Sequence, residues 1–130
     1  VLSGWFRAGL GYVDLREGHE ARARATFIDV QQRFREMGSK IGVVYALEGL
    51  ASLAVRRRDF DRAARLYAWT NGMRTKIGDQ RPPVEQAEVD RDTAVVQAQL
   101  TAQALQAATL AGRDMTMDEA VALASESRTM

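Results

Sequence analysis

The sequence predicts an all-α fold, an α-α superhelix in which helical hairpins repeat in tandem. Apolar residues recur at intervals of three and four, with no run of strict alternation. The chain also matches itself at an offset of 40 residues, since Arg22-Ala23 returns as Arg62-Ala63 and Met37-Gly38 as Ile77-Gly78. Only two prolines occur among 130 residues, so little obstructs long helices. We therefore expect about six helices, forming two hairpins and a C-terminal helical cap.

Residues 1–40 are predicted to form the first hairpin. Its first helix carries an apolar stripe of Phe6, Leu10 and Val13, and a turn follows at residues 17–19. Gly38 stands where a glycine cap would end the second helix. The stripe of that second helix consists of Ala23, Phe27, Val30, Phe34 and Met37.

Residues 41–80 are predicted to form the second hairpin, with its turn near Arg58-Asp59 and a glycine cap at Gly78. Its apolar positions before the turn are Val44, Leu47, Ala51 and Ala54. Those after the turn are Ala63, Leu66, Tyr67, Thr70, Met73 and Ile77.

Equivalent positions of the two predicted hairpins also carry side chains of similar size. Small residues would let the two helices of a hairpin approach closely, and an aromatic ring would fill the space beside them. The equivalent pairs are Gly11 and Ala51, Ala23 and Ala63, and Phe27 and Tyr67.

Residues 81–130 depart from the repeat and are predicted to cap the stack. Proline is tolerated in the first turn of a helix, so Pro82-Pro83 can open a fifth helix that runs to about Leu100. This helix either continues through Thr101 or breaks there before continuing to Ala111. Thr116 and Glu119 have the spacing of a capping box that would start the last helix. The opposite end has no such cap, and we expect the chain to be a fragment of a longer repeat protein.

The order of small and aromatic residues resembles the tetratricopeptide repeat. The second unit matches the consensus spacing, whereas the first departs from it at Arg7 and Glu20. A period of 40 residues also exceeds the usual 34, which implies longer helices. The matching residues of the second unit are Leu47, Leu50, Ala51, Phe60, Ala63 and Tyr67.

The resemblance implies that the first helix of each hairpin lines a concave groove. Aromatic residues and arginines are common at binding surfaces, and Arg16 and Arg56, one repeat apart, could hold an acidic segment. Alternatively, these residues only pack against neighbouring helices. The implied groove residues are Trp5, Ala8, Tyr12 and Arg16 from the first unit, and Tyr45, Glu48, Ser52 and Arg56 from the second.

Residues 63–124 look like the C-terminal end of bacterial LuxR-type transcriptional regulators and of predicted ATPases with tetratricopeptide tails. The motifs include Ala63-Ala64-Arg65-Leu66, Pro82-Pro83 and Gly112-Arg113. This resemblance implies a protein–protein interaction or regulatory scaffold domain of a cytoplasmic signalling regulator. The nucleotide-binding loop and the helix-turn-helix of such proteins are not found in these residues, so neither ATP nor DNA binding is carried over.

Composition argues against several other classes of protein. The net charge of +1 does not call for nucleic acid, and the chain has no cysteine, which fits a reducing cytoplasm. The single histidine, His19, falls in a turn, where a catalytic base would lack a pocket. The uncharged residues 93–112 contain four glutamines and much alanine, too little apolar surface for a membrane helix. We expect no enzyme activity, cofactor or metal.

Three kinds of partner remain open. The first is a protein or peptide, including upstream domains of the parent chain, with an acidic segment favoured by the two arginines. The second is a small-molecule effector held by the helical groove. The third is a further copy of the chain, if the domain is a structural cap that mediates self-association.

Overall fold

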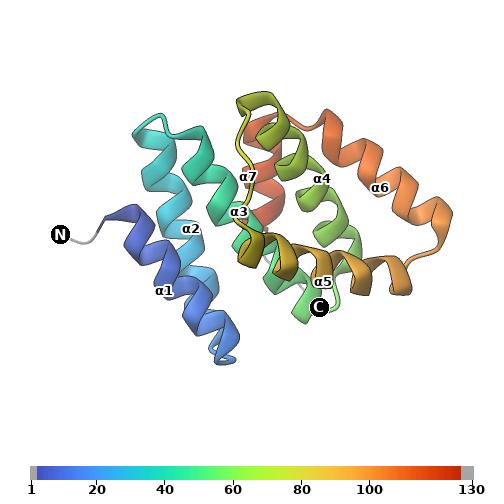
Figure 1. Cartoon of the computed structure of the whole chain (residues 1–130), viewed down its shortest axis with the longest axis horizontal. Coiled ribbons are helices and arrows are strands. Elements are labelled where there is room, and N and C mark those ends of the chain that lie inside the picture. The colour runs from blue at the N-terminus through green and yellow to red at the C-terminus, as the bar shows by residue number, and fades with distance from the viewer. Residues whose placement is uncertain (1–2, 127–130) are drawn as a thin grey trace.

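The computed structural model describes residues 3–126, and this part of the chain is entirely helical, as predicted (Figure 1). It contains no strand between those limits. Within it, no helix combines the length and the hydropathy needed to cross a bilayer. The helices are α1 (Gly4–Arg16), α2 (Glu20–Glu36), α3 (Lys40–Arg56), α4 (Phe60–Ile77), α5 (Pro83–Gln99), α6 (Ala102–Asp114) and α7 (Met117–Ser125).

The first four helices preserve the 40-residue repeat. α1 and α3 end at the equivalent residues Arg16 and Arg56, and α2 and α4 begin at Glu20 and Phe60. The predicted glycine caps are confirmed, since Gly38 and Gly78 have φ angles of 74° and 78°, a left-handed conformation that suits glycine. The two hairpins therefore use the same turns at the same places.

One aromatic ring holds α2 between its two neighbours. A Cβ atom added to Gly11 on α1 would lie 3.0 Å from the ring of Phe27, and one added to Gly49 on α3 would overlap the same ring. Phe27 is completely buried, as is Ala23 one turn before it, and their equivalents Tyr67 and Ala63 are buried too. The small residues thus bring the helices close enough for an aromatic side chain to fill the interface.

The apolar stripe of α1 does not face its hairpin partner. The helix buries Ala8, Gly11 and Leu15, while Phe6 and Leu10 are exposed. Gly11 faces the ring of Phe27, and the rings of Tyr12 and Trp5 lie 4.8 Å from those of Phe27 and Phe34, so Phe6 and Leu10 lie on another face of the helix. Met37 and Ile77, assigned to apolar stripes from the sequence, are also exposed because they follow or end the last turn of their helices.

The expected number of about six helices is too small, since seven lie within residues 3–126. The chain breaks at Leu100 and Thr101, where the backbone is extended. The side chain of Thr101 then caps the new helix by accepting a hydrogen bond from the Ala104 N–H at 3.1 Å. The predicted capping box is present at the next break, between Thr116 and Glu119.

The three C-terminal helices surround the second hairpin. In Figure 1, α5 crosses in front of α3 and α4, α6 packs along α4, and α7 lies behind α3 and α4. Hydrogen bonds of 2.7 Å tie the end of this segment back to both hairpins, from Arg24 to the carbonyl of Ser125 and from Arg62 to that of Glu126.

Two helical glycines predict opposite effects of the same substitution. Gly72 lies inside α4 with open space where a Cβ would stand, so Gly72→Ala should stabilise the protein by about 0.5–1 kcal/mol through helix propensity. Gly112 on α6 packs against the backbone of Arg65, which a Cβ would overlap, so Gly112→Ala should cost about 1–3 kcal/mol. Urea unfolding of both variants measures the two values. Equal effects would contradict the packing of α6 on α4.

Candidate functional site

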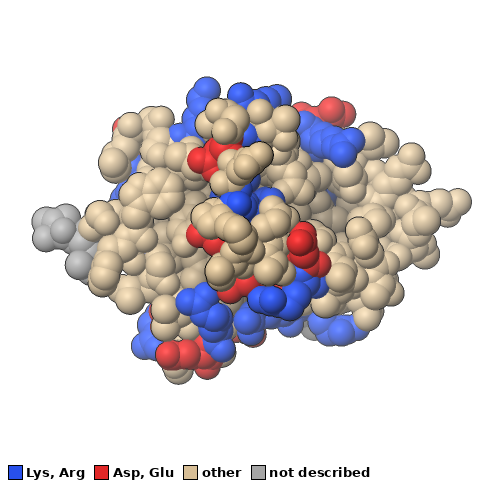
Figure 2. Space-filling view, viewed as in Figure 1, with Lys and Arg blue, Asp and Glu red and all other residues tan. Residues whose placement is uncertain are grey.

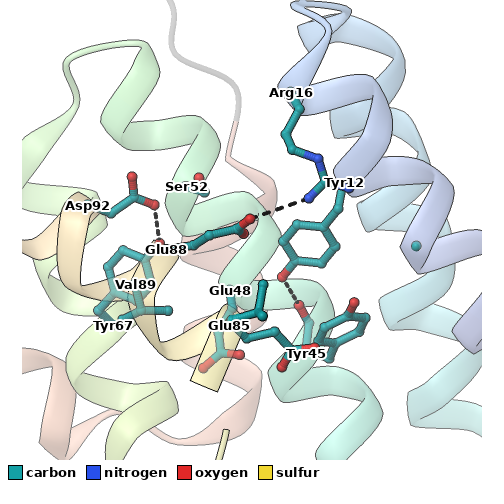
Figure 3. Close-up of a pocket in the computed structure, with 12 residues that line it drawn as sticks. Tyr12, Arg16, Tyr45, Glu48, Ser52, Tyr67, Glu85, Glu88, Val89 and Asp92 are labelled. Carbon is teal, nitrogen blue, oxygen red and sulfur yellow. Dashed lines mark hydrogen bonds and ion pairs between the residues drawn. The ribbon is translucent and has the colours of Figure 1, made fainter. Parts of the chain in front are cut away.

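A pocket of about 220 Å³ lies where α5 crosses the two hairpins. It draws residues from four helices, and Figure 3 shows their side chains converging on the space between α1, α3 and α5. The lining residues are Gly9, Tyr12 and Arg16 of α1, Tyr45, Glu48 and Ser52 of α3, Tyr67 of α4, and Val84, Glu85, Glu88, Val89 and Asp92 of α5.

Tyrosines form the walls of the pocket and are held in place by hydrogen bonds. The hydroxyl of Tyr12 donates to the carbonyl of Tyr45 at 2.7 Å, and the two rings lie 4.9 Å apart (Figure 3). The hydroxyl of Tyr67 donates to Asp92 at 2.6 Å, which links α4 to α5. Burial raises the pKa of Tyr12 and of Tyr67 well above 10, and the Asp92 carboxylate adds to the shift at Tyr67. Both hydroxyls therefore remain protonated donors at neutral pH.

A buried ion cluster adjoins the pocket, which one of its members, Glu48, lines. Both carboxylate oxygens of Glu48 accept hydrogen bonds from Arg74, at 2.7 and 3.0 Å, and Arg81 also donates to Glu48, at 2.8 Å from Nε. The three side chains are at most 7% exposed. Burial alone would lower the pKa of Arg74, but the hydrogen bonds and charge of Glu48 outweigh burial and raise it.

The cluster occupies a place that is apolar in the first repeat. Glu48 is equivalent to Ala8, and Arg74 is equivalent to Phe34, and all four are buried. The first repeat thus packs an aromatic ring beside small residues of α1, where the second uses a carboxylate and a guanidinium. Because Arg81 lies just before α5, the polar version also binds the segment that leads into that helix.

The carboxylates of α5 differ in how far they are neutralised. Glu88 lies 3.5 Å from Arg16, at the long end of the range for an ion pair (Figure 3). Glu85 has no hydrogen bond to any other described residue. Burial raises its pKa against the opposing effect of Arg74, and the nearby Glu48 adds to the increase. Glu85 is therefore the carboxylate with most to gain from a cation.

The structure brings together five of the eight predicted groove residues: Tyr12, Arg16, Tyr45, Glu48 and Ser52. Trp5 lies beside the pocket, with its ring 5.5 Å from that of Tyr45, and lines an adjoining hollow. Arg56 is exposed at the end of α3 and does not line the pocket, so it is not placed there with Arg16. Ala8 is buried and does not line the pocket.

The contribution of α5 was missed in the sequence. Glu85 lies in the first turn of α5, and Glu88 follows three residues later. Their spacing carried a further signal, because residues 85, 88, 89 and 92 follow intervals of three and four and so share one helix face. That face lines the pocket.

Other chemistry-bearing residues lie outside the pocket. The His19 side chain is about half exposed in the turn after α1, 3.8 Å from Glu17. Residues 3–126 contain no cluster of three or more histidines or carboxylates arranged to hold a metal ion.

No protein-family model, curated protein or solved structure matches the chain. The site is therefore interpreted from its own geometry.

Removal of the Glu48 charge should destabilise the fold strongly. Glu48→Gln would leave the buried guanidinium groups of Arg74 and Arg81 without their carboxylate, at a cost of about 3–5 kcal/mol. Asp61→Asn breaks an exposed ion pair with Arg65 and should cost less than about 1 kcal/mol. Chemical denaturation compares the two. A small loss for Glu48→Gln would show that the cluster does not hold α3, α4 and α5 together.

The raised pKa of Glu85 predicts a pH-dependent effect. Because folding favours its protonated form, ionised Glu85 opposes folding once the pH rises above the unfolded value, near 4.5. Glu85→Gln should therefore raise the melting temperature at pH 7, and the gain should disappear as the pH falls below that of the unfolded carboxyl. Thermal melts from pH 3.5 to 7 test this, and a gain that grows toward low pH would contradict it.

Proposed function

We propose that the chain is a non-catalytic interaction domain of a bacterial signalling regulator, related to tetratricopeptide scaffolds, that binds a protein segment at the pocket under α5. The observation that carries this proposal is the composition of that pocket, which draws tyrosines and charged residues from both repeats and from α5. Tyrosine offers a large contact area with a polar group, and is common where proteins bind one another.

The charge of the pocket favours a basic segment over an acidic one. One arginine and four carboxylates line it, and of these carboxylates Glu48 is the one that pairs with Arg74 and Arg81. Glu85, Glu88 and Asp92 all come from one face of α5, and of these Glu85 makes no hydrogen bond or ion pair with another residue of the range 3–126. A lysine or arginine of the bound segment would pair with Glu85 beside the ring of Tyr45.

Binding at this pocket would also give the domain a means of regulation, because a ligand there would fix the position of α5. α5 buries only Val89 and Val96, so it is held to the hairpins largely by side chains that surround the pocket. A ligand that contacts α5 together with α1 and α3 would fasten α5 in place, and would stabilise the folded domain by mass action. The segment would come from another protein or from another domain of the same regulator.

Selection from a library of random 12-residue peptides on the purified domain tests the proposal. We expect enriched peptides to carry lysine or arginine, and to bind Glu85→Lys at least tenfold more weakly, because the substitution reverses the charge at the pocket. Fluorescence anisotropy measures each affinity. Glu36→Lys is the matched control, since Glu36 is exposed at the end of α2 and does not line the pocket.

Peptides that bind Glu85→Lys and Glu36→Lys equally well would contradict the proposed site. Enrichment of acidic peptides would instead support the expectation from the sequence, in which Arg16 and Arg56 hold an acidic segment.

A second candidate function is the sensing of a small cationic effector in the same pocket. Its volume, about 220 Å³, suits a small organic ligand, and the faces of Tyr12, Tyr45 and Tyr67 next to Glu85 suit an ammonium or guanidinium group. Thermal shifts with a panel of such compounds separate the two candidates. A rise in melting temperature that Tyr45→Ala abolishes would favour the effector, whereas no rise would leave the protein segment as the ligand.

A further inference from the structure

α1 presents an apolar face that no other part of the described chain covers. Phe6, Leu10 and Val13 are 55%, 43% and 39% exposed. Together with Gly9 they follow intervals of three and four, so they form one continuous strip on the outer side of the helix. Figure 2 shows a broad area without charged side chains at the end of the molecule where α1 lies.

In the second repeat, the equivalent face of α3 is covered by other helices. The equivalent residues of α3 are Ala46, Leu50 and Leu53, and they are 0%, 3% and 3% exposed. α2 packs against α3 here, and the ring of Phe27 fills the notch that Gly49 leaves in the surface. Leu50 and Leu53 also border a hollow that Ala124 of α7 lines.

The notch on α1 is empty. Gly9 is the equivalent of Gly49, and a Cβ atom placed on it would meet nothing within 4 Å. We propose that the strip of Phe6, Gly9, Leu10 and Val13 docks an amphipathic helix of the same kind as α2, with an aromatic side chain that enters the notch at Gly9. This interface would repeat the α2–α3 interface one unit earlier.

The interface that already exists defines the chemistry of the partner. α2 presents Phe27 and Phe34, seven residues apart and so on one face, to glycines of α3. Its other sides carry arginines that pair with carboxylates, such as Arg22 with Asp14 and Arg33 with Asp29. A matching partner has aromatic residues at that spacing on one face and charged residues on the others. Gly9 also lines the pocket under α5, whereas Phe6, Leu10 and Val13 do not.

Protection of a thiol tests the docking, because the chain has no cysteine of its own. The probe is a synthetic peptide of residues 20–36, the α2 sequence. We expect it to slow labelling of the Leu10→Cys variant at least tenfold, and to leave labelling of Leu110→Cys unchanged, since Leu110 is exposed on α6. Adding Gly9→Ala should abolish the protection by filling the notch, whereas adding Gly72→Ala, an equally open glycine on α4, should not.

A short peptide folds poorly as an isolated helix and binds weakly, so a second experiment links the docking helix covalently to the chain. A copy of residues 1–40 placed before Val1 continues the repeat in register, and should protect the Leu10→Cys thiol without added peptide. No protection in either experiment overturns the proposal, as does protection that survives Gly9→Ala. Self-association of the chain that Gly9→Ala abolishes would also overturn it, by making a second copy the occupant. The Glu85→Lys variant should still show protection, so failure of the pocket proposal would leave this one standing.

Discussion

The whole arrangement of the repeats depends on the ring of Phe27, which fills a glycine notch on each of its two neighbours. Gly11 admits it from α1 and Gly49 from α3, so a single side chain sets the distance between the helices of one hairpin and the stacking of that hairpin on the next. Complete burial of such a ring is worth several kcal/mol, and a bulkier residue at either glycine would force the helices apart. The orientation of α1 follows from this contact, because Gly11 must face the ring of Phe27.

The second repeat keeps this geometry and changes its chemistry. Glu48 and Arg74 replace an alanine and a phenylalanine, and the buried charges then require further partners. Arg81 supplies one and thereby anchors the chain that enters α5. The position of α5 creates the pocket, since its carboxylates meet the tyrosines of α1, α3 and α4 there. The candidate site is in this sense a consequence of one buried ion pair, Glu48 and Arg74, at two positions that are apolar in the first repeat.

The hairpins could be predicted from the sequence because their determinants are local or recur at a fixed offset. The glycine caps at Gly38 and Gly78 and the capping box at Thr116 are examples. The break at Thr101 was left open because neither proline nor glycine marks it. The burial of Glu48 could not be predicted from the sequence. A polar residue in a groove is ordinary, and the burial of this one depends on Arg81, 33 residues later. Which face of α1 is covered depended likewise on the size of side chains on α2.

The most direct test of the account is the same substitution at two equivalent glycines, measured by equilibrium unfolding. Gly49→Ala should destabilise the protein by about 1–3 kcal/mol, because its Cβ would overlap the ring of Phe27. Gly9→Ala should instead stabilise it by about 0.5–1 kcal/mol, because its notch is empty and alanine favours the helix. Opposite signs would establish that one repeat interface is filled and its copy on α1 is open. Equal losses at both positions would contradict the stacking of the two hairpins described above.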